Sequence, residues 1–229
     1  MLLLAFDTAT PAVTVAVCEP HGDGVRVCAQ TSSIDARRHG ELLAPGIHAV
    51  VAEAGATLAD LTHVAVGTGP GPYTGLRVGL ATGRALADAL DIACVGVPTL
   101  DALAWESGRG TPFIAATDAR RKEVFWARYD DAATRVSEIA VDRPAEVGTG
   151  GLPVIGHGAL LYPDVFGQTA TDPLYPSAGA LGEVAVRRLL AGEPLAEPNP
   201  LYLRRPDAQV PGTPKKVRQS MTPTAERSR

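Results

Sequence analysis

The chain has few of the residues from which disulfides, metal sites and nucleophilic sites are built. Its 229 residues include three cysteines, an odd number without metal-type spacing, and five histidines, no two of which stand four residues apart. No serine lies in a Gly-x-Ser-x-Gly elbow, and no complete nucleophile–base set is visible. These absences argue against a disulfide-stapled scaffold, a Cys/His zinc site and a serine hydrolase.

Charge and long apolar runs are also scarce. Only 20% of the residues are charged, the net charge is −4, and no apolar stretch approaches the length of a membrane span. No overall positive field therefore attracts nucleic acid, and if the protein serves an RNA pathway, a partner is expected to hold the RNA. The apolar start at residues 1–6 is too short for a signal peptide and meets Asp7 at once, which favours a cytoplasmic protein without a membrane role.

What the sequence does contain is an alternation of strand and helix patterns. The first group predicts strands at 2–7, 13–17, 25–29, 62–66 and 92–97, and helices at 39–55, 74–90 and 100–106. Three successive strands followed by alternating helices and strands predict one α/β lobe with a mixed sheet. The pattern then restarts, with strands at 113–117, 123–129 and 154–158 and a helix over 181–189 that has Ser177 as N-cap. Residues 206–229 predict a disordered basic tail.

Two apolar runs end in small polar or flexible residues. The first ends at Asp7-Thr8-Ala9-Thr10, and the second ends in the Gly/Pro loop 67–75, which leads into a helix. A strand, a flexible loop and a helix are the usual mount for an anion-binding backbone. The loop lacks the Gly-Lys-Ser/Thr of a P-loop, and Pro72 replaces the third glycine of a dinucleotide fingerprint. A phosphate cradle and a tight turn that only starts a packed helix both remain open.

Two further polar segments have alternative interpretations. Asp7 with Thr8 and Thr10 could hold a metal–phosphate group, or Asp7 could cap its own backbone. The turn at 118–123, Asp-Ala-Arg-Arg-Lys-Glu, is a third candidate site, for which a solvated hairpin turn is the favoured interpretation.

Gly75, Gly79 and Gly83 recur at intervals of four in the second long helix. Glycine is about 1 kcal/mol less favourable than alanine inside a helix, so three on one face need a physical reason. The reason is a neighbour that approaches closely with no side chains between, either the protein's own sheet or a helix of a partner. We favour the partner helix.

Four segments in order along residues 1–205 carry a resemblance to a known family. They are Ala-Phe-Asp-Thr-Ala-Thr at 5–10, Gly-Pro-Gly-Pro-Tyr-Thr-Gly at 69–75, Asp-Ala-Arg-Arg-Lys-Glu-Val at 118–124 and Pro-Leu-Tyr-Leu-Arg-Arg at 200–205. On these segments the chain resembles the TsaB (YeaZ) family. The resemblance implies an α/β fold of the actin/Hsp70/sugar-kinase (ASKHA) class, with two RNase H-like lobes with mixed sheets at 1–105 and 106–205.

The resemblance implies a non-catalytic subunit that supports TsaD, together with the ATPase TsaE, in threonylcarbamoylation of the adenosine beside the tRNA anticodon. TsaD carries a His-x-x-x-His metal pair, and Thr99 and Leu103 stand at the matching positions here, so we expect no catalytic residue and no metal. The tRNA is expected to be bound only through the complex. No cofactor is implied beyond weak adenine-nucleotide binding at the TsaD boundary.

The same resemblance places the partner surface on the helices at 39–55 and 74–90. A monomer and a homodimer both remain open for the protein alone, and an apolar helix face would favour a homodimer that competes with the heterodimer. The residues expected there, as interface or as the core beneath it, are Leu43, Ile47, Val50, Gly75, Leu76, Gly79, Leu80 and Gly83. A vestigial nucleotide site would comprise Asp7, Thr8, Gly69, Gly71 and Thr74.

The alternative function is an active enzyme of the same fold, either a nucleotide hydrolase or a small-molecule kinase. Against it, the segment that starts at Asp7 lacks the glycine that such kinases place after the first aspartate. A peptidase is disfavoured because neither a metal pair nor a nucleophile–base set can be found.

Overall fold

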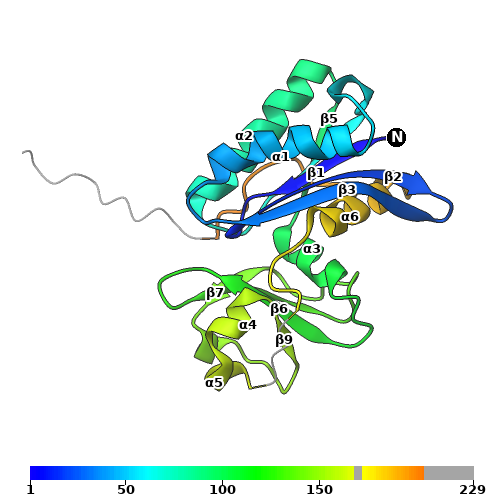
Figure 1. Cartoon of the computed structure of the whole chain (residues 1–229). Helices are drawn as coiled ribbons and strands as arrows, with labels where there is room; N and C mark the ends of the chain where they lie inside the picture. Colours follow the sequence, from blue (N-terminus) through cyan, green and yellow to red (C-terminus); the bar gives the residue numbers. More distant parts are fainter. Residues whose placement is uncertain (168–171, 204–229) are drawn as a thin grey trace, which may run out of the picture.

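The computed structural model describes residues 1–167 and 172–203, so the predicted tail at 206–229 lies outside the described residues. Its elements form two sheets with helices around them (Figure 1). The α/β class with two mixed sheets is confirmed. None of the described helices is both long and apolar enough to cross a membrane.

The first sheet has the strand order β3-β2-β1-β4-β5. Strands β1 (Leu3–Asp7), β2 (Ala12–His21) and β3 (Gly24–Ile34) form the predicted antiparallel meander. Strands β4 (His63–Gly67) and β5 (Ala93–Val97) continue the sheet in parallel with β1. A short 3-10 turn, η1 (Leu58–Asp60), precedes β4.

Both faces of the first sheet are covered, which explains why β1 is entirely apolar before Asp7. Leu4 and Phe6 contribute to the core beneath α1 (His39–Glu53) and α2 (Tyr73–Leu90). Leu3 and Ala5 point to the other side, into a core shared with α6 (Ala178–Leu190). Strands buried on both faces read as continuous hydrophobic runs.

The second sheet has the order β8-β7-β6-β9. It consists of β6 (Phe113–Asp118), β7 (Val124–Tyr129), β8 (Ala140–Asp142) and β9 (Val154–Ile155), with β6 and β9 parallel. The turn η2 (Pro144–Glu146) and helices α4 (His157–Leu161) and α5 (Pro163–Phe166) complete this part. The predicted strand at 154–158 was too long, because Gly156 turns the backbone to φ 91° and α4 begins at His157.

Helix α3 (Thr99–Glu106) lies between the two sheets. Leu100, Leu103 and Ala104 share a core with Phe113, Ala115 and Tyr129 of the second sheet. On the same helix, the buried carboxylate of Asp101 accepts hydrogen bonds from the Tyr129 hydroxyl (2.8 Å) and from Arg135 Nε (2.9 Å). Arg188 of α6 lies 3.6 Å from the same carboxylate. The Asp101 side chain therefore connects α3, the second sheet and α6.

The end of the described chain returns to the first sheet. Helix α6 packs against β1 and β2 through Leu181 and Ala185, and its N-cap is Ser177, as predicted. Beyond it, the amide of Leu201 donates to the carbonyl of Thr68 (2.9 Å). The sequence assigned α6 to the second lobe by position alone, whereas its packing is on the first sheet. The lobe boundaries at 105 and 205 stay a prediction.

Candidate functional site

The first candidate site is the carboxyl end of β1, where Asp7 is 1% exposed. Its Oδ1 accepts a hydrogen bond from the amide of Ala9 (2.6 Å), and its Oδ2 accepts one from the Thr99 hydroxyl (2.6 Å). The same Thr99 oxygen accepts from the amide of Gly69 (3.1 Å). The carboxylate is thus used to join the end of β1 to α3 and to the glycine loop.

The Gly/Pro loop lies directly on the end of β1. A Cβ atom added at Gly67 would collide with the Asp7 carboxylate, and one added at Gly71 would collide with the Ala9 carbonyl. The predicted nucleotide residues Asp7, Thr8, Gly69 and Gly71 are indeed brought together here, while Thr74 is exposed on the first turn of α2. Gly67 therefore leaves room for the Asp7 side chain and Gly71 for the backbone of Ala9, and the nucleotide site stays a prediction.

Burial also changes the chemistry of Asp7. Desolvation raises the pKa of its carboxyl group above the ordinary 3.8, and this is offset in part by the hydrogen bonds from Thr99 and Ala9 and by His39. His39 itself is held by a contact between its Nε2 and the Thr10 carbonyl (2.8 Å). A buried carboxyl group whose two oxygens are bound to Ala9 and Thr99 is a structural group, since a metal ligand needs an accessible oxygen.

The raised pKa makes stability depend on pH. The folded chain holds the Asp7 proton to higher pH than the unfolded chain does, so this stability is fully present below pH 3.8 and is lost as the pH rises through the folded-state pKa. We expect Asp7→Asn to gain stability relative to wild type between pH 4.5 and pH 7.5, as measured by urea unfolding at both values. The exposed Asp88→Asn serves as the net-charge control. An unchanged pH dependence in Asp7→Asn would contradict the assignment.

The second candidate is the glycine face of α2, which was expected to meet a partner helix. That expectation is corrected, because the glycines face the protein's own sheet. A Cβ at Gly75 would lie 2.5 Å from the Thr8 carbonyl oxygen, and one at Gly79 would lie 2.5 Å from Thr8 Oγ1. A Cβ at Gly83 would collide with Val66 of β4. The Thr8 hydroxyl also donates to the Gly75 carbonyl (2.7 Å) and accepts from the Gly79 amide (3.0 Å).

The other residues predicted for the partner surface are core residues as well. Their side chains are 0–5% exposed within this chain and lie in the cluster beneath α1 and α2: Leu43, Ile47, Val50, Leu76 and Leu80. The helical period identified the apolar face correctly. It could not show that the face is already covered by the chain's own sheet.

The outward face of α1 and α2 is the surface that these two helices present to solvent (Figure 1). We call it the outer helix face and define it by the exposed residues Ala44, Pro45, His48, Ala49, Ala52, Ala81, Ala85 and Ala89. Most of these side chains are alanine, and on α2 they recur every four residues. This alanine spacing is visible in the sequence, beside the glycine series of the same helix. Small side chains allow another helix to approach closely.

The positions that would match a metal pair are used for packing. Thr99 hydrogen-bonds to Asp7, and Leu103 is fully buried between the sheets. Within residues 1–167 and 172–203, no group of three or more His, Cys, Asp or Glu side chains is placed to hold a metal ion.

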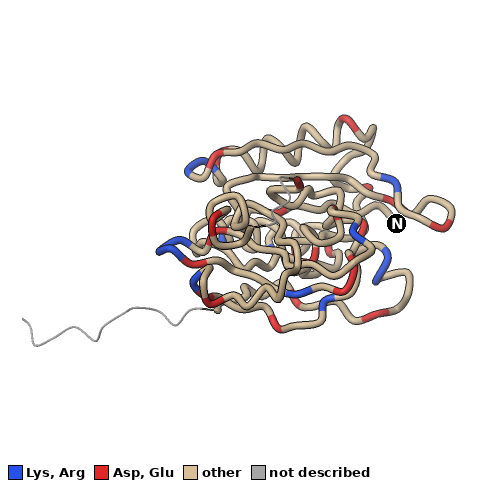
Figure 2. The backbone as a smooth tube through the Cα atoms, turned by 90° about the horizontal axis from the view of Figure 1, so that it is seen from below, with Lys and Arg blue, Asp and Glu red and all other residues tan. Residues whose placement is uncertain are grey.

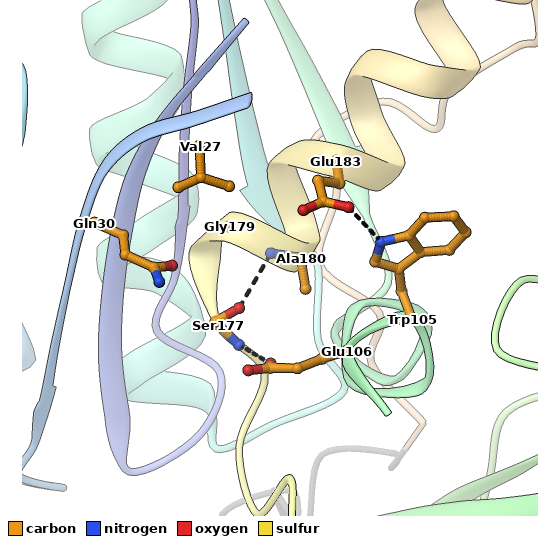
Figure 3. Close-up of a pocket in the computed structure, with 8 residues that line it drawn as sticks. All are labelled: Val27, Gln30, Trp105, Glu106, Ser177, Gly179, Ala180 and Glu183. Carbon is orange, nitrogen blue, oxygen red and sulfur yellow. Dashed lines mark hydrogen bonds between the residues drawn. The ribbon is translucent and has the colours of Figure 1, made fainter. Parts of the chain in front are cut away.

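A pocket lies where β3, α3 and the start of α6 meet (Figure 3). Its two acidic side chains are bound within the pocket: Glu106 accepts from the Ser177 amide (2.5 Å), and Trp105 Nε1 donates to Glu183 (2.9 Å). Burial, together with Asp172 and Glu183, raises the pKa of Glu106, while the hydrogen bonds from Ser177 lower it. The pocket is explained by the junction of these elements, and we assign it no ligand.

Comparisons with known proteins agree with the segments singled out above. The family model "TsaD: tRNA N6-adenosine threonylcarbamoyltransferase" matches residues 29–159. The tRNA threonylcarbamoyladenosine biosynthesis protein TsaB of Escherichia coli is 30% identical over 225 residues, covering 89% of this chain and 95% of that protein. An uncharacterized protein of Mycobacterium tuberculosis is 42% identical, covering 90% and 93%. The solved structure of YeaZ from Pseudomonas aeruginosa superposes with a TM-score of 0.74 at 29% identity, covering 88% of this chain and 99% of that one.

Proposed function

Since the chain belongs to the TsaB family of tRNA threonylcarbamoyladenosine biosynthesis proteins, we propose that it is a non-catalytic subunit that binds TsaD and, with TsaE, supports threonylcarbamoylation of tRNA. The observation that carries the proposal is the burial of the carboxyl group at the end of β1. Asp7 is buried and its two oxygens are bound to Ala9 and Thr99, so neither oxygen is accessible to a substrate or metal.

The outer helix face is the surface that we assign to TsaD. Because most of its side chains are alanine, a partner helix can come close to the backbones of α1 and α2, which suits close helix–helix packing. Since a TsaD-family model matches this chain, a related fold in the partner would offer an equivalent pair of helices. Two such pairs would meet as a four-helix bundle, and a homodimer would use the same face.

Light scattering after size exclusion tests this function directly. The full chain is measured alone and mixed with its cognate TsaD, and we expect a one-to-one complex. If no complex forms, even with TsaE and ATP present, the subunit assignment is wrong. Measurable ATP turnover by the chain alone would then favour the alternative of an active enzyme of this fold.

We expect Ala85→Arg on the outer helix face to weaken TsaD binding by at least about 100-fold, which corresponds to about 2.7 kcal/mol. A long cation without a partner at the centre of a helix contact is both too large and costly to desolvate. The monomer should keep its thermal stability, because residue 85 is exposed. Leu190→Arg, at an exposed position on α6, is the matched control and should bind normally. Equal binding by both variants would remove the outer helix face from the interface.

A further inference from the structure

The turn between β6 and β7 has an unusual backbone. Arg120, Arg121 and Lys122 follow one another with φ values of 61°, 56° and 64°. Arginine and lysine are strained in this left-handed region, which glycine adopts without cost and asparagine tolerates. Among the described residues, Asp91 is the only other non-glycine with positive φ, whereas nine glycines occupy such positions. This turn consists of three cationic residues and no glycine, so its backbone conformation lowers the stability of the fold.

The base of the turn is closed by its own hydrogen bonds. The Ala119 amide donates to the Glu123 carbonyl (3.0 Å), and the Arg120 amide donates to Asp118 Oδ1 (2.7 Å). The Arg120 guanidinium also pairs with Asp118 Oδ2 at 3.3 Å. Arg120, Arg121 and Lys122 are all exposed, and the tip of the turn consists of Arg121 and Lys122.

The turn stands at the edge of the second sheet where ligands of α/β proteins bind. It follows the carboxyl end of β6, next to the parallel strand β9, whose own carboxyl end leads through Gly156 to His157. Among the described residues, the buried Nδ1 of His157 has no hydrogen-bond partner. Asp118 and Arg120 both lie within electrostatic reach of this ring. The turn therefore lies beside a ring nitrogen, Nδ1 of His157, that makes no hydrogen bond among the described residues.

The turn is also well separated from the outer helix face. Helices α1 and α2 lie on the side of the first sheet that faces away from the second sheet (Figure 1). A partner bound to those helices leaves the β6–β7 turn uncovered. Lys and Arg occur elsewhere on the molecule as short, scattered segments and form no long basic stretch (Figure 2), so a contact with a polyanion is local.

We propose that Arg121 and Lys122 bind the phosphate backbone of the tRNA directly while the chain is held in its complex. This inference rests on the proposed function and extends it, because tRNA was expected to contact only the partner. Two adjacent cations on a short turn with a closed backbone have fixed Cα positions, so little loop freedom is lost when they meet successive phosphates. The strain of the turn is the cost of that fixed placement.

The test compares binding of an unmodified tRNA transcript to the complex of the full chain with TsaD. Asparagine tolerates the left-handed region, so Arg121→Asn with Lys122→Asn removes the charges and keeps the turn. We expect affinity at 100 mM salt to fall about 10-fold, and the slope of log K against log salt to become shallower by about 1.5. The control, Arg26→Asn with Arg187→Asn, has the same net charge and two exposed positions of ordinary backbone.

Each result decides the matter. Loss of RNA affinity in the turn variant alone supports the proposal, and equal losses in turn and control variants indicate a mere effect of net charge and overturn it. Intact RNA binding with a weakened protein complex would assign the turn to an acidic protein surface instead. Light scattering of every variant with TsaD shows separately whether the subunit assignment fails. In addition, Arg121→Gly with Lys122→Gly should raise Tm by about 2–6 °C and still lose RNA affinity.

Discussion

Replacing Gly79 by leucine is expected to prevent folding of the isolated chain. The added Cβ alone would lie 2.5 Å from Thr8 Oγ1, and the rest of the side chain would enter the space between α2 and the end of β1. The helix would have to move away, which breaks both hydrogen bonds of the Thr8 hydroxyl to Gly75 and Gly79. Overpacking costs about 1–3 kcal/mol even where neighbours can shift, and here the neighbours belong to a closely packed strand end.

The measurement is urea unfolding of Gly79→Ala and Gly79→Leu with circular dichroism. Alanine should lower the free energy of unfolding by about 1–3 kcal/mol in spite of its better helix propensity, and leucine should leave no cooperative transition. The matched control is Ala81→Leu, at an exposed position two residues further along the same helix, which should unfold like wild type. A stable Gly79→Leu protein that fails only to bind TsaD would mean that a partner covers the glycine face after all.

The second large effect is expected at Asp101. Substitution by alanine leaves Tyr129, Arg135 and Arg188 without the carboxylate that they share. Breaking a buried ion pair on one side costs about 3–5 kcal/mol, and partial exposure of both arginines reduces the expected loss to about 2–4 kcal/mol. Both sheets contact α3, so the transition should also become broader or split into two steps.

Calorimetry of Asp101→Ala against wild type checks this expectation. Asp101→Asn keeps one acceptor oxygen and should lie between the two. Asp88→Ala removes an exposed carboxylate of α2 and should change stability by less than about 0.5 kcal/mol. A loss at Asp101 no larger than at Asp88 would mean that the junction is held by apolar packing alone.

The fold could be predicted from the sequence where the signal was local. The succession of alternating runs gave the meander and the parallel strands, and Ser177 marked the start of α6. The position of α6 was not predictable in this way, since its apolar stripe says only that something covers it. Its partners Leu3 and Ala5 are more than 170 residues away in sequence.

The candidate site was harder to predict from the sequence, for a related reason. Small residues every four positions indicate close approach, but α2 carries two such series, glycine on the inner face and alanine on the outer. Spacing cannot tell which of them meets the protein's own strand. The left-handed turn at Arg120 was also hidden, because Arg-Arg-Lys has none of the residues that mark positive φ.

The return of α6 to the first sheet has a consequence for synthesis. Until residues 178–190 have left the ribosome, Leu3, Ala5, Ala16 and Cys18 lack the helix α6 that packs on that side of the sheet. The 84 residues from the end of α3 at Glu106 to Leu190 take about 4–17 s to translate. For that interval the nascent chain displays an apolar sheet face, so a ribosome-bound holdase should be its first partner, before any subunit of its own complex.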